Sequence, residues 1–318
     1  MAVIVPSIVF TTLALFSVIA RLVARILVLR IAGRDEAAII AAMICSLALL
    51  VATVGETSRG LGRHESEINQ KDAQDLRKYL FTSVVFYHAT LGLTKTSIIF
   101  QYLRVFYDTP IRIACWAVLT IVSFYSISAV STSIFTCRPV AAFWDKSIEG
   151  DCFKTGGFLY FFHPSFNILT DLVLITLPLP MLSTLSLPRK QKIGLMLVFT
   201  LGGFVCVVSI VRLYSVVVSV KSNDLSFTNT SIALWSIIEA NVGIICASLP
   251  TIRPLLVRYL PCTFSRRETS NLTTRTVTGS DFELNRAPNE FFSQFNDDGS
   301  AHGILSSNGT KGDAEKGQ

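Results

Sequence analysis

The chain has 318 residues, of which 51% are hydrophobic and only 16% are charged, and its mean hydropathy is +0.52. Soluble domains are about one-quarter charged, so this composition excludes an ordinary soluble fold and indicates a membrane protein. The net charge of +6 does not indicate nucleic-acid binding, because membrane proteins gather Lys and Arg in their cytoplasmic loops. The seven cysteines lack the paired spacing of zinc sites, so we expect no metal site.

Apolar stretches recur along the chain, each close to or above the roughly 20 residues that cross a bilayer as a helix. We therefore predict an all-α, polytopic seven-transmembrane-helix bundle over residues 1–262, followed by a disordered cytoplasmic tail over residues 263–318. The predicted spans cover residues 3–29, 37–54, 80–103, 113–135, 158–182, 193–220 and 231–249.

The first span, MAVIVPSIVFTTLALFSVIA, has no basic residue before it and several arginines after it. A secretory signal peptide opens with positive charge, so we expect an uncleaved span with its N-terminus outside the cytosol. Arg21 and Arg25 fall in the inner part of this helix. We expect their guanidinium groups to reach back to the membrane interface.

Basic residues in the connections indicate the orientation. Arg189, Lys190 and Lys192 lie in a tight connection between the fifth and sixth spans, and short loops rich in Lys and Arg stay on the cytoplasmic side. The polar stretch 55–79 carries five basic and five acidic residues, as suits an outer loop. We therefore expect the N-terminus outside and the C-terminus in the cytosol.

The predicted outer loop between the fourth and fifth spans contains Cys137 and Cys152. In this topology both cysteines lie on the oxidising side of the membrane. A disulfide between them would close a loop of about 15 residues and stabilise the fold by about 3 kcal/mol in the chain-entropy account. We predict this disulfide, and two free thiols are the alternative.

Four ionisable residues stand out inside the predicted spans: Lys95, Asp171, Arg212 and Glu239. A charge near the bilayer centre costs about 2.5 to 3.5 kcal/mol, so such side chains face the bundle interior or a wet cavity. We expect Asp171, Arg212 and Glu239 to form an ion-paired cluster, with Lys95 deeper toward the cytosol.

Further polar residues accompany these charges. His163 and Asn167 precede Asp171 at intervals of four, so the three share one helix face. Trp235 lies one turn before Glu239, and Asn241 lies nearby on a different face. We interpret these residues and the four charges as candidates for a ligand or proton site. The alternative is a static polar lock between helices.

Five sequence segments of the chain together resemble one family. They are GLGRH at 60–64, TCRPVAAFWD at 136–145, GDC at 150–152, the run DLVLITLPLPMLSTLSLPRKQKIGL from Asp171, and the run WSIIEANVGIICASLPTIRPL from Trp235. They resemble the fungal integral membrane proteins with a rhodopsin domain, which include pathogenicity-related receptor-like proteins and proteins of mycotoxin gene clusters such as the satratoxin cluster. The resemblance covers about residues 15–262 and implies a receptor-like seven-helix architecture.

A rhodopsin domain raises the question of retinal, which needs a lysine in the last span for its Schiff base. The predicted last span, 231–249, contains no lysine. We therefore expect no retinal and no other cofactor.

Three classes of function follow from these patterns. We expect a receptor-like sensor of an unidentified small molecule in a fungal plasma membrane or endomembrane, with lipid around it and a cytoplasmic signalling partner. The alternatives are a small-metabolite transporter or channel, and an accessory protein or enzyme of secondary metabolism. The sequence contains no nucleophile elbow, His-rich metal motif or phosphate loop, which disfavours an enzyme. It also lacks an internal repeat, which disfavours a transporter built from two related halves.

Overall fold

The computed structural model describes residues 3–28, 33–63, 69–105, 109–145, 147–152, 158–178, 189–221 and 225–259. The α-helices within these ranges are α1 (Ile4–Leu22), α2 (Arg34–Ser58), α3 (Gln70–Val105), α4 (Thr109–Ile134), α5 (Phe158–Thr176), α7 (Arg189–Lys221) and α8 (Leu225–Tyr259). The shorter elements are a π-helical turn η1 (Val23–Val28), strands β1 (Cys137–Arg138) and β2 (Asp151–Cys152), and a 3-10 turn η3 (Val140–Phe143). The predicted tail over 263–318 lies outside the described residues.

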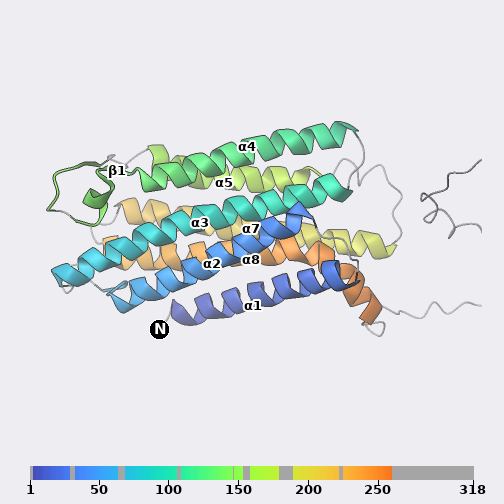
Figure 1. The fold of residues 1–318 in the computed structure, drawn as a ribbon, viewed down its shortest axis with the longest axis horizontal. Coiled ribbons are helices and arrows are strands. Elements are labelled where there is room, and N and C mark those ends of the chain that lie inside the picture. Colours follow the sequence, from blue (N-terminus) through green and yellow to red (C-terminus); the bar gives the residue numbers. More distant parts are fainter. Residues whose placement is uncertain are drawn as a thin grey trace, which may run out of the picture. The chain divides into compact units, whose positions relative to one another are not determined.

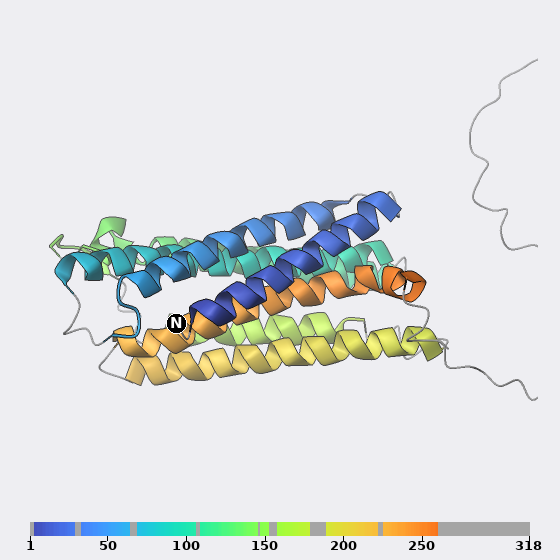
Figure 2. The ribbon, with the colours of Figure 1, turned by 90° about the horizontal axis from the view of Figure 1, so that it is seen from below.

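The helices lie side by side and run in alternating directions (Figures 1 and 2). Helix α3 packs against α2, α4 and α8, while α8 also contacts α1, α2 and α7, and α5 packs against α7. The strands β1 and β2 lie at the end of the bundle where α1 begins, which we call the hairpin end. At the other end, which we call the opposite end, α1 finishes and α2 starts.

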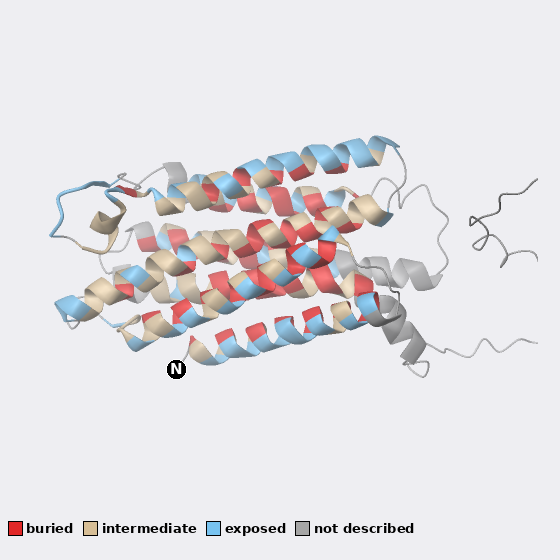
Figure 3. Ribbon diagram, viewed as in Figure 1, coloured by how far each residue is buried: buried red, intermediate tan, exposed pale blue. Residues whose placement is uncertain are grey.

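Many large apolar side chains are exposed on the described surface of the bundle, whereas several charged groups lie in its interior. Phe16 and Phe124 are 73% and 77% exposed, but Arg21 and Glu239 are 0% exposed. Figure 3 shows α1 and α4 with exposed residues on their outer sides and buried residues toward the neighbouring helices. This arrangement is unfavourable in water and favourable in hydrocarbon, where apolar side chains meet lipid and polar ones pair inside the bundle.

Helical segments long and apolar enough to cross a membrane are found five times among the described residues: Ile4–Ile26, Arg34–Ser58, Thr109–Ile134, Gly202–Ser219 and Asn229–Thr251. Helices α3 and α5 are not among them. The mostly helical character of the chain is therefore confirmed, and the five segments support a polytopic membrane protein.

Close helix packing depends on small residues at the contacts. A Cβ atom on Gly92 of α3 would lie 2.5 Å from Oγ and 2.7 Å from Cβ of Ser126 on α4. Glycine therefore permits this approach. Nearby, Ile99, Cys115 and Leu119 join α3 and α4 in one apolar cluster.

Two connections differ from the sequence-based prediction. Residues 70–79 were expected in an outer loop, but they form the first turns of α3. Arg59 lies 3.0 Å from Asp72 and 3.2 Å from Asp75, so ion pairs join the end of α2 to these first turns of α3. Likewise α7 begins at Arg189, so the predicted connection contributes its basic residues to a helical turn.

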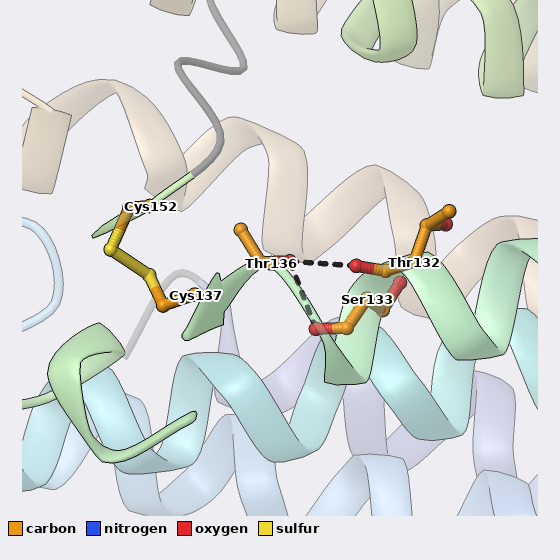
Figure 4. The surroundings of a disulfide bond; sticks show 5 residues. All are labelled: Thr132, Ser133, Thr136, Cys137 and Cys152. Atoms are coloured by element: carbon orange, nitrogen blue, oxygen red, sulfur yellow. Dashed lines mark hydrogen bonds between the residues drawn. A yellow bond between two sulfur atoms is a disulfide. The ribbon is translucent and has the colours of Figure 1, made fainter. Parts of the chain in front are cut away.

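The predicted disulfide between Cys137 and Cys152 is confirmed (Figure 4). These cysteines are directly opposite each other in the antiparallel pair β1–β2. Just before β1, the Thr136 hydroxyl donates to the carbonyl oxygens of Thr132 and Ser133, at 2.8 and 3.0 Å. These bonds satisfy carbonyl groups at the end of α4, which have no helical partner of their own.

The hairpin packs on the first turns of α3. The rings of Phe143 and Trp144 both lie 5.6 Å from the ring of Phe81, measured between centroids. Farther along the loop, the hydroxyl and backbone N–H of Ser147 donate to Asp145 Oδ1, at 2.6 and 3.0 Å. These hydrogen bonds hold the pKa of Asp145 below its ordinary value.

Candidate functional site

Polar and charged side chains from α3, α5, α7 and α8 meet inside the bundle, and all of them are buried. We call this group the central polar cluster. Its members are Tyr87, Lys95, Asn167, Thr170, Asp171, Ser209, Arg212, Ser236 and Glu239.

Lys95 joins α3 to α5. Its Nζ lies 3.0 Å from Asp171 Oδ1 and donates to the carbonyl oxygen and Oδ1 of Asn167, at 3.0 and 2.7 Å. Lys95 Nζ also donates a hydrogen bond of 2.6 Å to Thr170 Oγ1. Because an ammonium group has three protons, these four acceptors fill its hydrogen-bonding capacity.

Glu239 on α8 accepts hydrogen bonds from three helices. Tyr87 Oη of α3 donates to Oε2 at 2.7 Å, and Asn167 Nδ2 of α5 donates to Oε1 at 2.8 Å. Ser209 Oγ of α7 also donates to Oε1. Hydrogen bonds of this kind compensate a carboxylate for lost hydration.

Arg212 is the cation beside Glu239. Its Nε lies 3.7 Å from Glu239 Oε2 and donates to Ser236 Oγ at 3.0 Å. Its Cζ also lies 4.1 Å from the centre of the Tyr87 ring, which places the guanidinium over an aromatic face. The four charges of the cluster thus form two pairs with no net formal charge.

The pairing differs from the prediction in one respect. Asp171 was expected to pair with Arg212, with Lys95 lying deeper, but Asp171 pairs with Lys95. Asn167 and Ser209 lie between the two ion pairs, since each contacts both Asp171 and Glu239. Helical spacing places these residues inward but does not determine how neighbouring helices are rotated about their axes.

A cavity of about 90 Å³ adjoins the central polar cluster. Lys95, Asp171 and Glu239 supply the charged part of its wall. The lining residues continue along α3 to Tyr102 and along α8 to Pro250, so the cavity extends from the cluster toward the opposite end. One water needs about 10 to 15 Å³ measured in this way, so the cavity has room for several waters or a small molecule.

A second charged group lies toward the opposite end. We call it the Arg21 ion cluster, and its members are Arg21, Arg25, Asp35, Glu36, Ser97, Gln101 and Arg104. Arg21 Nη2 lies 3.2 Å from Asp35 Oδ2, and Arg21 Nε lies 3.1 Å from Glu36 Oε2. Arg104 Nη1 lies 3.2 Å from Asp35 Oδ1, and Arg25 lies 3.8 and 3.7 Å from Asp35 and Glu36.

The sequence-based interpretation of Arg21 is wrong. Its guanidinium was expected at the membrane interface, but the residue is 0% exposed. Asp35 and Glu36, in the first turn of α2, provide the partners that make its burial tolerable. Two acids directly after a run of arginines were the signal in the sequence that could have indicated this pairing.

Two residues belong to both the cavity wall and the surroundings of Arg21. Arg21 Nη1 donates to the Ala247 carbonyl oxygen at 2.6 Å and to Gln101 Oε1 at 3.4 Å. Both Ala247 and Gln101 line the cavity. A change in the cavity wall can therefore reach Arg21 directly.

His163, although predicted with Asn167 and Asp171, lies apart from the ion pairs. Its Nε2 is 3.2 Å from Thr132 Oγ1, and its carbonyl oxygen accepts a 2.7 Å bond from Tyr125. The His163 ring lies 5.7 Å from that of His88, between centroids. In the part of the chain that the structure describes, no three His, Cys, Asp or Glu side chains converge as a metal site.

Trp235 and Asn241 also lie outside the central polar cluster. Trp235 packs beside an apolar cluster of α7 and α8. Asn241 donates to Thr11 Oγ1 at 3.1 Å and accepts from Ser46 Oγ at 2.8 Å, so it links α8 to α1 and α2. Tyr87 and Ser209, which were not predicted, belong to the cluster instead. Uncharged Tyr and Ser residues are common, and nothing in their spacing distinguished these two.

A family model described as the fungal rhodopsin domain matches residues 20–258, a range that contains all five sequence segments that carry the resemblance. Receptor GIN3 of Arthrobotrys oligospora is 28% identical over 188 residues, which cover 59% of this chain and 45% of the relative.

Two further relatives are similar over longer stretches. The polyenoic acids biosynthesis gene cluster protein Ba17b of Metarhizium anisopliae is 26% identical over 263 residues, or 78% of this chain and 71% of the relative. The SAT4 family membrane protein of Emericella nidulans is 28% identical over 216 residues, or 66% and 53%. The chain thus spans about half the length of two of these three relatives. No solved structure matches the chain.

Proposed function

The chain belongs to the fungal rhodopsin-domain family of multi-pass integral membrane proteins, and on this premise we propose that it is a receptor-like sensor of a small molecule. One observation carries the proposal: the cavity lies against the central polar cluster, where four helices meet. A molecule bound there would contact groups that hold these helices together. Its binding would favour the helix arrangement that fits it better.

The proposed topology has seven spans, with the N-terminus outside and the C-terminus in the cytosol. Helices α3 and α5 complete the seven, because their polar side chains face the bundle interior and are compensated there. The disulfide supports an external hairpin end, since disulfides persist in oxidising compartments. The opposite end, with the basic residues at the start of α7, would then face the cytosol and a signalling partner.

A second candidate is a carrier or an accessory membrane protein of secondary metabolism. The relative Ba17b is named for a biosynthesis gene cluster, and ion pairs beside a cavity also suit a carrier. Neither retinal nor an enzymatic reaction is part of either proposal, because α8 contains no lysine and the central polar cluster presents charges already paired with each other.

The test is a thermal-shift screen of the purified full chain with candidate metabolites, followed by flux measurements in liposomes. A ligand at about 100 times its Kd should stabilise the protein by about 2.7 kcal/mol. A Gly243→Val variant is the control. A Cβ atom at Gly243 lies in ordinary contact with Thr94, 3.7 Å away, so the extra methyl groups enter the cavity.

Binding without flux, abolished in Gly243→Val, supports the sensor. Flux across the liposome membrane instead identifies a carrier. A thermal shift that persists unchanged in Gly243→Val would show that the ligand binds elsewhere.

A further inference from the structure

The cavity wall indicates the chemical class of the molecule it takes, and this inference rests on the function proposed above. We propose that the cavity takes an electrically neutral, mainly apolar molecule, and that Gln101 is its hydrogen-bonding partner.

The charges in the wall are already compensated by the protein. Lys95 pairs with Asp171, and Glu239 pairs with Arg212 just behind the wall. The hydrogen-bonding capacity of Lys95 is filled by four acceptors from α5. A charged ligand would therefore enter a region of low dielectric without a counterion, which is strongly unfavourable. A neutral ligand avoids this cost.

The rest of the wall is mostly hydrocarbon. Leu91 and Ile98 of α3 face the cavity, as do Leu174 and Ile175 of α5 and Val205 of α7. Binding sites of this kind hold the body of a ligand by apolar contact and orient it with a few polar groups. We therefore expect a largely apolar molecule with one or two hydrogen-bonding groups.

Gln101 is the polar group best placed for this orientation. Its side chain is buried and faces the cavity. Within the described part of the chain, its amide makes one hydrogen bond, the long 3.4 Å bond that Oε1 accepts from Arg21. A glutamine amide has two N–H donors and two acceptor lone pairs, so its Nε2 donors remain available to a ligand. Such a ligand would act on the same side chain that contacts Arg21.

Cys246 permits a test that needs no knowledge of the natural ligand, because this cysteine lines the cavity and lies outside the disulfide. The test protein is the full chain with its four other non-disulfide cysteines changed to alanine: Cys45, Cys115, Cys206 and Cys262. Methanethiosulfonates then report on the cavity. The Cys246 thiol gives up its proton to solvent, and the thiolate attacks the divalent sulfur of the reagent; a mixed disulfide forms as the bond from that sulfur to the sulfonyl group breaks and methanesulfinate leaves.

Three reagents differ in charge: hydroxyethyl, trimethylammonioethyl and sulfonatoethyl methanethiosulfonate. Each rate is divided by the rate of the same reagent with free mercaptoethanol. We expect the neutral reagent to exceed both charged ones by about tenfold or more, because a charge must be desolvated to enter. Equal normalised rates, a faster charged reagent, or no labelling by the neutral reagent would overturn the proposal. Gly243→Val should slow the neutral reagent, and an unchanged rate would show that the reagent arrives by another route and also overturn it.

The role of Gln101 is tested with propyl methanethiosulfonate, which matches the hydroxyethyl reagent in size but lacks the hydroxyl. We expect the hydroxyethyl reagent to react about fivefold faster after normalisation, and Gln101→Met to abolish this preference, as removal of one hydrogen bond predicts. A preference that survives in Gln101→Met would exclude Gln101 as the partner. Labelling measures the cavity alone, so these outcomes stay separate from failure of the sensor proposal in the thermal-shift and flux experiments.

Discussion

The central polar cluster and the Arg21 ion cluster compensate their buried charges in different ways. In the central polar cluster each cation has one acidic partner, and the formal charges cancel. In the Arg21 ion cluster three arginines share two acids, so each acid has at least two cationic partners. The first arrangement gives each acid one cationic partner, whereas the second is redundant.

This difference suits the two clusters to different tasks. The central polar cluster borders the cavity, so its compensated charges leave the wall neutral toward a ligand. The Arg21 ion cluster joins the ends of α1, α2 and α3, and its redundancy lets one contact be exchanged while the others hold. Gln101 and Ala247 connect the two, since both line the cavity and both bind Arg21.

Lys95→Met should have the largest effect, because it leaves Asp171 without its cation. Breaking a buried ion pair by removing one partner costs about 3 to 5 kcal/mol of unfolding free energy. Chemical denaturation in detergent micelles measures this loss. The double variant Lys95→Met/Asp171→Asn should recover much of it, because no unpaired charge is left. A double variant as unstable as the single one would show that Lys95 and Asp171 do not act as an independent pair.

Arg21→Met should cost less, about 2 kcal/mol, although Arg21 is more deeply buried than Lys95. Arg25 and Arg104 remain to pair with Asp35, and Arg25 remains to pair with Glu36. The same denaturation experiment compares the two variants. A loss in Arg21→Met equal to or larger than that in Lys95→Met would contradict the redundancy of the Arg21 ion cluster.

Sequence reasoning predicted the contents of the central polar cluster better than its pairing. Charges in long apolar runs must face inward, and this condition alone identified Lys95, Asp171, Arg212 and Glu239. The partner of Asp171 depends on how α3 is rotated against α5, which spacing along one helix does not encode. The helices themselves could be predicted because the length of an apolar run is a property of one segment. A contact between two helices depends on both of them.

The Arg21 ion cluster was missed because each of its members has an ordinary explanation in the sequence. An arginine near the end of a membrane helix commonly extends to the interface, and an acid in the first turn of a helix is favoured by the helix dipole. Only the fold shows that Arg21 points inward and meets Asp35 and Glu36. The disulfide, by contrast, follows from two cysteines in a single loop, and it was predicted correctly.

Gln101→Glu should have a smaller effect, of opposite sign to the first two. The new carboxylate would replace an amide whose Oε1 lies 3.4 Å from Arg21 Nη1, so the long bond from Arg21 would become a charge-assisted one. We expect a gain of about 1 kcal/mol in unfolding free energy, and a loss of about 0.5 kcal/mol in the control Gln101→Met, which cannot bond Arg21. If Gln101→Glu were less stable than Gln101→Met, the contact of this side chain with Arg21 would not be the stabilising interaction assigned to it.

The smallest effect is expected at Asp145 in the hairpin, which is partly exposed to water and so differs from both buried clusters. Its two bonds from Ser147 lower its pKa, so the ionised form is favoured in the folded state. The resulting stabilisation is present above the ordinary aspartate pKa of about 3.9 and is lost as pH falls through the lowered folded value. The protection of the Ser147 amide against hydrogen exchange, relative to the intrinsic rate at each pH, should therefore fall only in acid, and Asp145→Asn should remove this pH dependence while shifting the melting temperature by about 1 °C or less. Asp145 carries the same charge as Asp35 and Asp171. If the change in stability at Asp145 is small while the changes in the two buried clusters are large, then burial, more than the number of charges, decides how much each carboxylate contributes to stability.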